Sequence, residues 1–132
     1  MRVLDTDVCV EILRGNDGVI ARRRQLRDEV VTTWITAAEL FFGAARSRAP
    51  AGNAALVREL LATVGLVGVD MPAAERFGEL KAGLQREGRR LADADLLIAA
   101  ITLVHGAILV TGNTRHYQRI TGLSMEDWIR AA

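Results

Sequence analysis

Four short runs of apolar and β-branched residues divide the chain. Each run is bounded by glycine, threonine or charged residues, which can end a strand. The runs are Arg2–Asp5, Val30–Ile35, Leu66–Asp70 and Ala107–Thr111. We interpret them as buried β-strands, because strands that are covered on both faces carry continuous apolar sequence.

The segments between these runs carry apolar residues three or four positions apart, which places them on one face of a helix. Examples are the series Ala73, Phe77, Leu80, Leu84 and the series Leu56, Leu60, Val64. Asp70 followed by Pro72 predicts a helix start, and His105 before Gly106 predicts a helix end. The segment Ser47–Asn53, with its proline and glycine, divides one helical region into two.

Strands that alternate with helices predict an α/β fold with a parallel sheet covered on both sides. Parallel strands require crossover connections, and these are usually right-handed and helical. A length of 132 residues suits one hydrophobic core. We therefore expect a single domain over residues 1–132.

Composition narrows the class of protein further. Half of the residues are hydrophobic and a quarter are charged, which is typical of a globular chain and excludes a disordered one. The single cysteine, Cys9, lies between two valines and predicts a buried thiol in a reducing compartment. Without a signal region or a long apolar run, we expect a cytoplasmic protein that does not enter a membrane. The net charge of +1 gives no overall attraction to nucleic acid, so any RNA binding requires local basic patches.

Acidic and amide residues follow the predicted strands. In open parallel sheets the functional site lies outside the carboxyl ends of the strands, so these positions are candidates for chemistry. Asp5 and Asp7 follow the first strand, and Glu39 follows the second. The helix before the last strand begins near Asp93 and Asp95, and the last strand leads to Asn113.

Carboxylates gathered at one edge suit a hard divalent cation. Magnesium and manganese take oxygen ligands, and magnesium keeps several waters while using few carboxylates. Such an ion activates water and stabilises phosphoryl charge, so no histidine, cysteine or serine nucleophile is needed. The pattern favours hydrolysis of a phosphodiester.

Each acid also has a purely structural interpretation. Asp5 or Asp7 could cap the following helix, and Thr36 with Glu39 reads as a capping box. Asp93 and Asp95 suit a helix N-terminus through the macrodipole. Their convergence favours a metal site, because neighbouring carboxylates raise one another's pKa unless a cation neutralises them.

Five segments in order resemble the VapC toxins, which are PIN-domain ribonucleases of bacterial toxin–antitoxin pairs. They are VLDTD (3–7), ITAAEL (35–40), DLLIAA (95–100), LVTGNTRHY (109–117) and GLSMEDW (122–128). The resemblance spans nearly the whole chain. It implies a PIN-like α/β/α sandwich with a central, mainly parallel sheet of four to five strands.

The resemblance also implies a function. It predicts the toxin of a type II toxin–antitoxin system: an endoribonuclease that uses Mg²⁺ or Mn²⁺, is inhibited by a VapB-type antitoxin and forms a homodimer. Carried over position by position, Asp5, Glu39 and Asp95 are the catalytic acids and metal ligands. Asp93 matches an extra acidic position only loosely.

Two positions depart from the family pattern. The family commonly has asparagine where this chain has Asp7, which adds a charge near the expected metal. Where relatives often carry a further acid, this chain has Asn113 and His116, so the number of metal ions stays open. Asn113 could hold a metal-bound water, and His116 could contact RNA phosphate.

Basic and apolar segments suggest where partners bind. Arg115 and Arg119 follow Asn113, and the basic residues between Lys81 and Arg90 lead into Asp93, so both groups could meet RNA phosphates. Tyr117 either stacks on an unpaired base or packs in the core. The segment Leu40–Phe42 and the helix Leu56–Val64 offer either a groove for an antitoxin helix or core packing.

Two other functions fit parts of the sequence. Residues 3–8 also resemble the first motif of haloacid-dehalogenase-like phosphatases, with Asp5 as nucleophile and Asp7 as acid/base. That family needs a lysine in a downstream motif, and the only lysine, Lys81, lies in the middle of a predicted helix. A catalytically silent binding module is the second alternative, because the fourth acid is missing.

Overall fold

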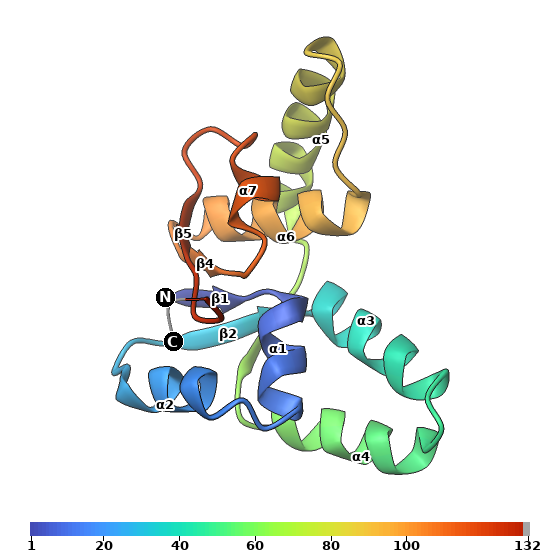
Figure 1. Ribbon diagram of the computed structural model, residues 1–132. Helices are drawn as coiled ribbons and strands as arrows, with labels where there is room; N and C mark the ends of the chain where they lie inside the picture. Colours follow the sequence, from blue (N-terminus) through green and yellow to red (C-terminus); the bar gives the residue numbers. More distant parts are fainter. Residues whose placement is uncertain (131–132) are drawn as a thin grey trace.

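A computed structural model of the chain describes residues 1–130 and contains five strands and seven helices in that range (Figure 1). The strands are β1 Arg2–Leu4, β2 Val30–Thr33, β3 Gly65–Val67, β4 Ile108–Val110 and β5 Ser124–Glu126. The helices are α1 Thr6–Leu13, α2 Asp17–Gln25, α3 Trp34–Ala45, α4 Pro50–Leu61, α5 Met71–Arg86, α6 Asp93–Val104 and α7 Thr114–Tyr117.

The five strands form one parallel sheet in the order β3-β2-β1-β4-β5. β1 is central, so Val3 pairs in register with Val31 on one side and Leu109 on the other. The four predicted strands are confirmed, and β5 follows them near the end of the described chain. The second strand is shorter than predicted: it ends at Thr33, because the hydroxyl of that residue caps α3.

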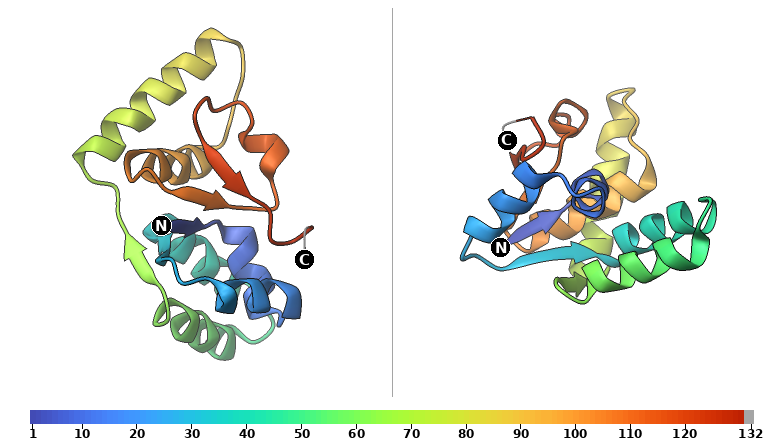
Figure 2. Two further views of the ribbon diagram at one scale, coloured as in Figure 1. Left: turned by 90° about the vertical axis from the view of Figure 1, so that its left-hand side faces the viewer. Right: turned by 60° about the horizontal axis from the view of Figure 1, so that its bottom comes forward.

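Alternate residues of the strands point into two separate cores, one on each face of the sheet. Val3 and Leu109 pack against α5, α6 and α7 on one face. Leu4 and Val110 pack against α1 to α4 on the other. Two further views show the sheet between these two helical layers (Figure 2). The predicted α/β/α sandwich is confirmed.

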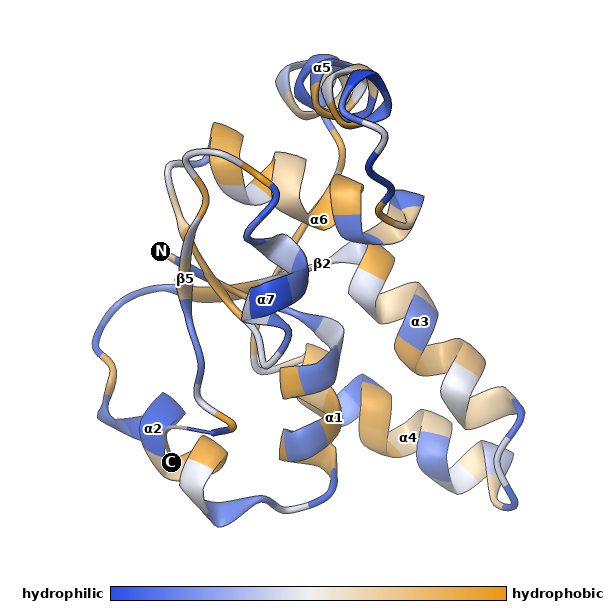
Figure 3. Ribbon diagram, turned by 45° about the horizontal axis from the view of Figure 1, so that its top comes forward, coloured by the Kyte–Doolittle hydropathy of each residue, from blue (hydrophilic) through white to orange (hydrophobic). Residues whose placement is uncertain are grey.

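Helix α6 is the most buried helix of this sandwich. Six of its residues are buried, and its ribbon is mainly orange in the hydropathy view, whereas the outer helix α5 carries more polar positions (Figure 3). A helix between the sheet and another helix must be apolar on more than one face. Because α6 leads into β4, its first turn lies at the carboxyl edge of the parallel sheet.

Local signals set several element ends as predicted. Asp70 caps α5 by accepting a hydrogen bond from the Ala73 amide, and Pro72 lies in the first turn. His105 ends α6, and Gly106 follows with a φ of +59°, a left-handed conformation that favours glycine. Cys9 is buried. Within residues 1–130, no helix is long and apolar enough to cross a membrane.

Candidate active site

The starts of α1, α3 and α6 gather at one end of the sheet, at its carboxyl edge (Figure 1). Asp5 immediately follows β1, Glu39 lies in the second turn of α3, and Asp95 lies in the first turn of α6. Hydrogen-bonding residues between them determine how the three acids are arranged.

Asp5 is the most buried of the acids, with 4% of its surface exposed. Its Oδ1 accepts a hydrogen bond from the Thr6 amide at 2.9 Å, and its Oδ2 accepts one from the Thr111 hydroxyl at 2.9 Å. Burial, and then the charge of Asp7, raise the pKa of Asp5 to about 6. Asp5 is the N-cap of α1, as one interpretation predicted. It also places a buried carboxylate at the site, and burial makes ionisation of that carboxylate unfavourable.

Asp95 is held by two side chains of α7. His116 Nε2 lies 3.0 Å from Asp95 Oδ2, and the Tyr117 hydroxyl donates to Asp95 Oδ1 at 3.3 Å. Hydrogen bonding from Tyr117 also acts on Asp5, where it lowers the pKa. The Tyr117 hydroxyl therefore donates a hydrogen bond to Asp95 and also acts on the pKa of Asp5.

The role predicted for Tyr117 in stacking on RNA is wrong. Its ring is fully buried in the core beneath α7, so neither face can meet a base. Burial and the charges of Asp5 and Asp95 raise the pKa of its hydroxyl, which stays protonated and able to donate. The alternative prediction of core packing is confirmed, with the hydroxyl serving the acids.

Glu39 reaches the site through Thr6. The Thr6 hydroxyl donates to Glu39 Oε1 at 2.7 Å and lies 3.0 Å from the Thr36 hydroxyl. The predicted capping box is wrong, because α3 begins earlier: Thr33 is the cap and accepts from the Thr36 amide at 3.1 Å. Glu39 is consequently free of a capping role and faces Thr6, the neighbour of Asp5.

Asp7 accepts a hydrogen bond from the turn that follows β4. Its Oδ2 accepts from the Gly112 amide at 2.8 Å, and its Oδ1 is buried without a hydrogen-bond partner within residues 1–130. Burial is the main reason that its pKa is raised. A side chain at position 112 would not fit, since a Cβ there would lie 2.9 Å from both Asp7 Oδ2 and Ile129 Cδ1.

Asp93 and Asn113 contact none of the three acids directly. Asp93 is 60% exposed and pairs with Lys81 at 3.0 Å; it lies in the first turn of α6, as the macrodipole interpretation requires, and makes no capping hydrogen bond. Asn113 is exposed, and its backbone N–H donates to the Thr111 hydroxyl oxygen at 3.0 Å. The only lysine of the sequence, Lys81, therefore forms an ion pair with Asp93. A haloacid-dehalogenase-like phosphatase would need that lysine beside Asp5.

The arrangement fits a magnesium site that is completed by water. Within residues 1–130, no three His, Cys, Asp or Glu side chains come close enough to enclose a metal by themselves. Magnesium usually binds one or two carboxylates and keeps several waters, so these side chains could hold it only with water as further ligands. The buried Asp5 carboxylate also supplies uncompensated negative charge.

Sequence reasoning missed the threonines that organise these acids. Thr6 links Glu39 to the first strand, and Thr111 joins Asp5 to the turn at Asn113. Thr111 directly follows β4, and Thr6 is the second residue after β1. Their position was the signal that could have identified them.

Comparisons with known proteins agree with this geometry. The family described as PIN domain matches residues 2–122. The chain is 32% identical to the tRNA(fMet)-specific endonuclease VapC of Shigella flexneri, over 96% of each chain. It is 30% identical to Ribonuclease VapC2 of Haemophilus influenzae, over 96% of this chain and 97% of the relative.

Solved structures show the same fold. A crystal structure of VapBC from Salmonella typhimurium bound to DNA matches with a TM-score of 0.91 and 30% identity, over 96% of this chain and 97% of that one. VapBC2 from Rickettsia felis, bound to a DNA fragment from its promoter, matches with a TM-score of 0.91 and 26% identity, over 96% and 98%. The likeness covers almost the whole chain in each case.

Proposed function

This chain belongs to the PIN-domain family, as a VapC-type toxin ribonuclease, and from that premise we propose that it cleaves RNA with Mg²⁺ or Mn²⁺ bound by Asp5, Asp95 and Glu39. The observation that carries the assignment is the Tyr117 hydroxyl, which donates to Asp95 Oδ1 at 3.3 Å and lowers the pKa of Asp5. It acts on two acids that lie 90 positions apart in the sequence, one after β1 and one in the first turn of α6.

The protein's own groups prepare the site for a phosphodiester. Thr111 and the Thr6 amide fix both oxygens of Asp5, and His116 and Tyr117 fix both oxygens of Asp95. A divalent cation at these carboxylates supplies activation of water for attack on phosphorus and neutralisation of phosphoryl charge. Thr6 holds Glu39 beside Asp5, where it can orient a water.

The test measures cleavage of total RNA and of a tRNA pool by purified protein, with Mg²⁺, Mn²⁺ or EDTA. We expect cleavage only with a metal, and a loss of at least about 100-fold in Asp95→Asn and Glu39→Gln with an unchanged circular dichroism spectrum. Asp93→Asn is the matched control, because it removes the exposed acid two residues from Asp95. Cleavage at the wild-type rate by either site variant would show that its assignment as a ligand is wrong.

A VapB-type antitoxin is the proposed inhibitor, in line with the VapBC complexes among the similar structures. A groove of about 430 Å³ runs between α1, α3 and α4, with Thr6 and Glu39 among its lining residues. Leu40 is largely core, whereas Leu56 is 48% exposed in the groove and Phe42 is 64% exposed on α3. An amphipathic helix that covers this groove would also cover the acids.

The remaining proposals concern assembly, substrate and place of action. We propose a homodimer, one domain over residues 1–132, RNA contacts from Arg115 and Arg119, and action in the cytoplasm, where RNA is available. Sedimentation velocity tests the dimer. Relatives named as tRNA(fMet)-specific endonucleases make tRNA the first substrate to test.

A further inference from the structure

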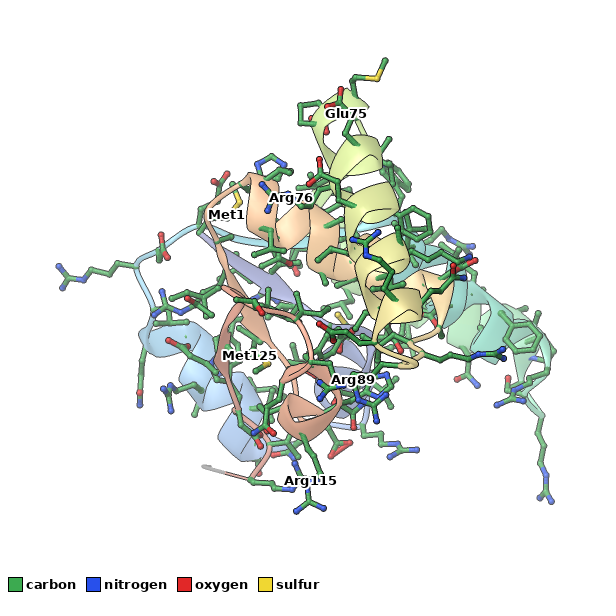
Figure 4. The ribbon with its side chains drawn as sticks, turned by 90° about the horizontal axis from the view of Figure 1, so that it is seen from above. Met1, Glu75, Arg76, Arg89, Arg115 and Met125 are labelled. Atoms are coloured by element: carbon green, nitrogen blue, oxygen red, sulfur yellow. The ribbon has the colours of Figure 1, made fainter. Side chains whose placement is uncertain are left out.

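Three adjoining hollows lie beside the candidate active site, on the side of α7 and the loop after α5. The central hollow, of about 750 Å³, is lined by Gly88, Arg89, Arg90, Arg115, Gln118 and Arg119, and we call it the arginine trough. Figure 4 shows the labelled side chains of Arg89, from the loop, and Arg115, from α7. Tertiary folding brings these two basic segments to one surface.

At its α7 end the arginine trough adjoins a hollow that reaches His116, the neighbour of Asp95. Arg115 and Arg119 also line a second hollow of about 740 Å³, together with His116. His116 Nε2 is 3.0 Å from Asp95 Oδ2. A chain molecule lying in the trough can therefore extend past His116 to the acids.

At its other end the trough continues toward α5. Arg89 and Arg90 also line a third hollow of about 580 Å³ that includes Lys81 and Asp93, which pair with each other at 3.0 Å. The hollow with Lys81 and the hollow with His116 each share lining residues with the arginine trough, so the three form one path from α5 across α7 to His116, which contacts Asp95.

The charge of the trough is one-sided. Four of its six lining residues are arginines and none is acidic. Arg90 and Arg115 are exposed, and their side chains make no ion pair within residues 1–130; Arg89 is 53% exposed, with its Nε 3.8 Å from Glu87. The trough is thus a local basic patch on a chain with a net charge of only +1.

One contact holds the two sides of the trough together. Arg119 Nη1 donates to the Arg90 carbonyl oxygen at 2.8 Å, which ties the segment just after α7 to the loop after α5. The remaining guanidinium groups are presented on a joined surface. Arginine forks match phosphate oxygens in two parallel hydrogen bonds, so a row of them suits a phosphate backbone.

We propose that the arginine trough binds the backbone phosphates of single-stranded RNA to one side of the bond that is cleaved at Asp5 and Asp95. The inference rests on the proposed function and adds where the substrate strand lies. An acidic segment of a protein partner is the competing ligand. RNA is favoured because the trough leads to Asp95, whereas the apolar groove between α1, α3 and α4 is lined by other residues.

Binding is measured in EDTA, so that RNA stays intact. The probe is a fluorescein-labelled ten-nucleotide oligouridylate, and its Kd is followed by anisotropy from 50 to 300 mM salt. The test variant is Arg89→Gln with Arg115→Gln, and Arg119 is left in place to keep the loop attached. The matched control is Arg24→Gln with Arg27→Gln, which removes two exposed arginines outside the trough.

For a single strand, each neutralised phosphate makes the slope of log K against log salt concentration steeper by about 0.7. Relative to 1 M salt, that is about fivefold in affinity at 0.1 M salt. We therefore expect the test variant to bind about 25-fold more weakly, with a slope lower by about 1.4, and the control to change little. An unchanged Kd and slope in the test variant would overturn the proposal, whether or not antitoxin binding weakens. Failure of the proposed function would appear separately, as absence of metal-dependent cleavage by the wild type.

Discussion

Replacing Asp5 by asparagine should inactivate the protein and stabilise it at the same time. The carboxylate is buried, and its pKa is raised to about 6 because burial and the charge of Asp7 disfavour ionisation. Asparagine has nearly the same shape and no charge. Its amide can still accept from the Thr6 N–H, and it can donate to the Thr111 hydroxyl oxygen.

The magnitude follows from proton linkage. An acid whose pKa rises on folding binds more protons in the folded state than in the unfolded state. The contribution of Asp5 to the free energy of unfolding is therefore most favourable below its ordinary pKa of 3.8, and it falls as the pH rises through about 6. At about 1.4 kcal/mol per pKa unit, ionised Asp5 costs up to about 3 kcal/mol at pH 7. We expect Asp5→Asn to recover about 1–3 kcal/mol there and much less at pH 4. For a chain of this length, that is roughly 3–10 °C in Tm.

The assay is thermal unfolding in EDTA at pH 4 and pH 7, repeated at pH 7 with 10 mM Mg²⁺. Wild-type protein should gain stability with Mg²⁺ and the variant should not, because the ion binds the folded carboxylate. Asp93→Asn is the control and should be nearly neutral, since that carboxylate is exposed. A lower Tm for Asp5→Asn at pH 7, or a difference that does not depend on pH, would refute the reasoning.

Three further predictions concern the surroundings of the site. Asp7→Asn should keep substantial RNA cleavage, because Asp7 binds the Gly112 amide and does not contact the other acids; total loss in an RNase assay would give it a direct role. Asn113→Asp should tighten Mn²⁺ binding measured by calorimetry, because a carboxylate attracts a dication more strongly than an amide does. An unchanged affinity would place residue 113 outside the ligand shell of the metal. Gly112→Ala should lower stability by about 1–3 kcal/mol in denaturant unfolding, because its Cβ would lie 2.9 Å from Asp7 and from Ile129; an unchanged midpoint would show that this turn yields.

Sequence alone determined the features that depend on neighbouring residues. Apolar runs and helical spacing identified four strands and the α/β class, because burial on a sheet or a helix face repeats along the chain. Asp70 and Gly106 set their helix ends through local hydrogen bonds and backbone conformation. Parallel topology then put Asp5 and the start of α6 at one edge of the sheet.

Only the tertiary structure decided how the side chains at that edge meet. Thr111 reaches Asp5 across 106 positions and Thr6 reaches Glu39 across 33, and no local pattern encodes such distances. Packing buried the ring of Tyr117, so a residue predicted either to contact RNA or to pack in the core donates a hydrogen bond to Asp95 from the core. α3 begins after Thr33 rather than at Thr36, since Thr33 both pairs with Val67 in the sheet and caps the helix through its side-chain hydroxyl, a double role that the strand pattern alone did not reveal.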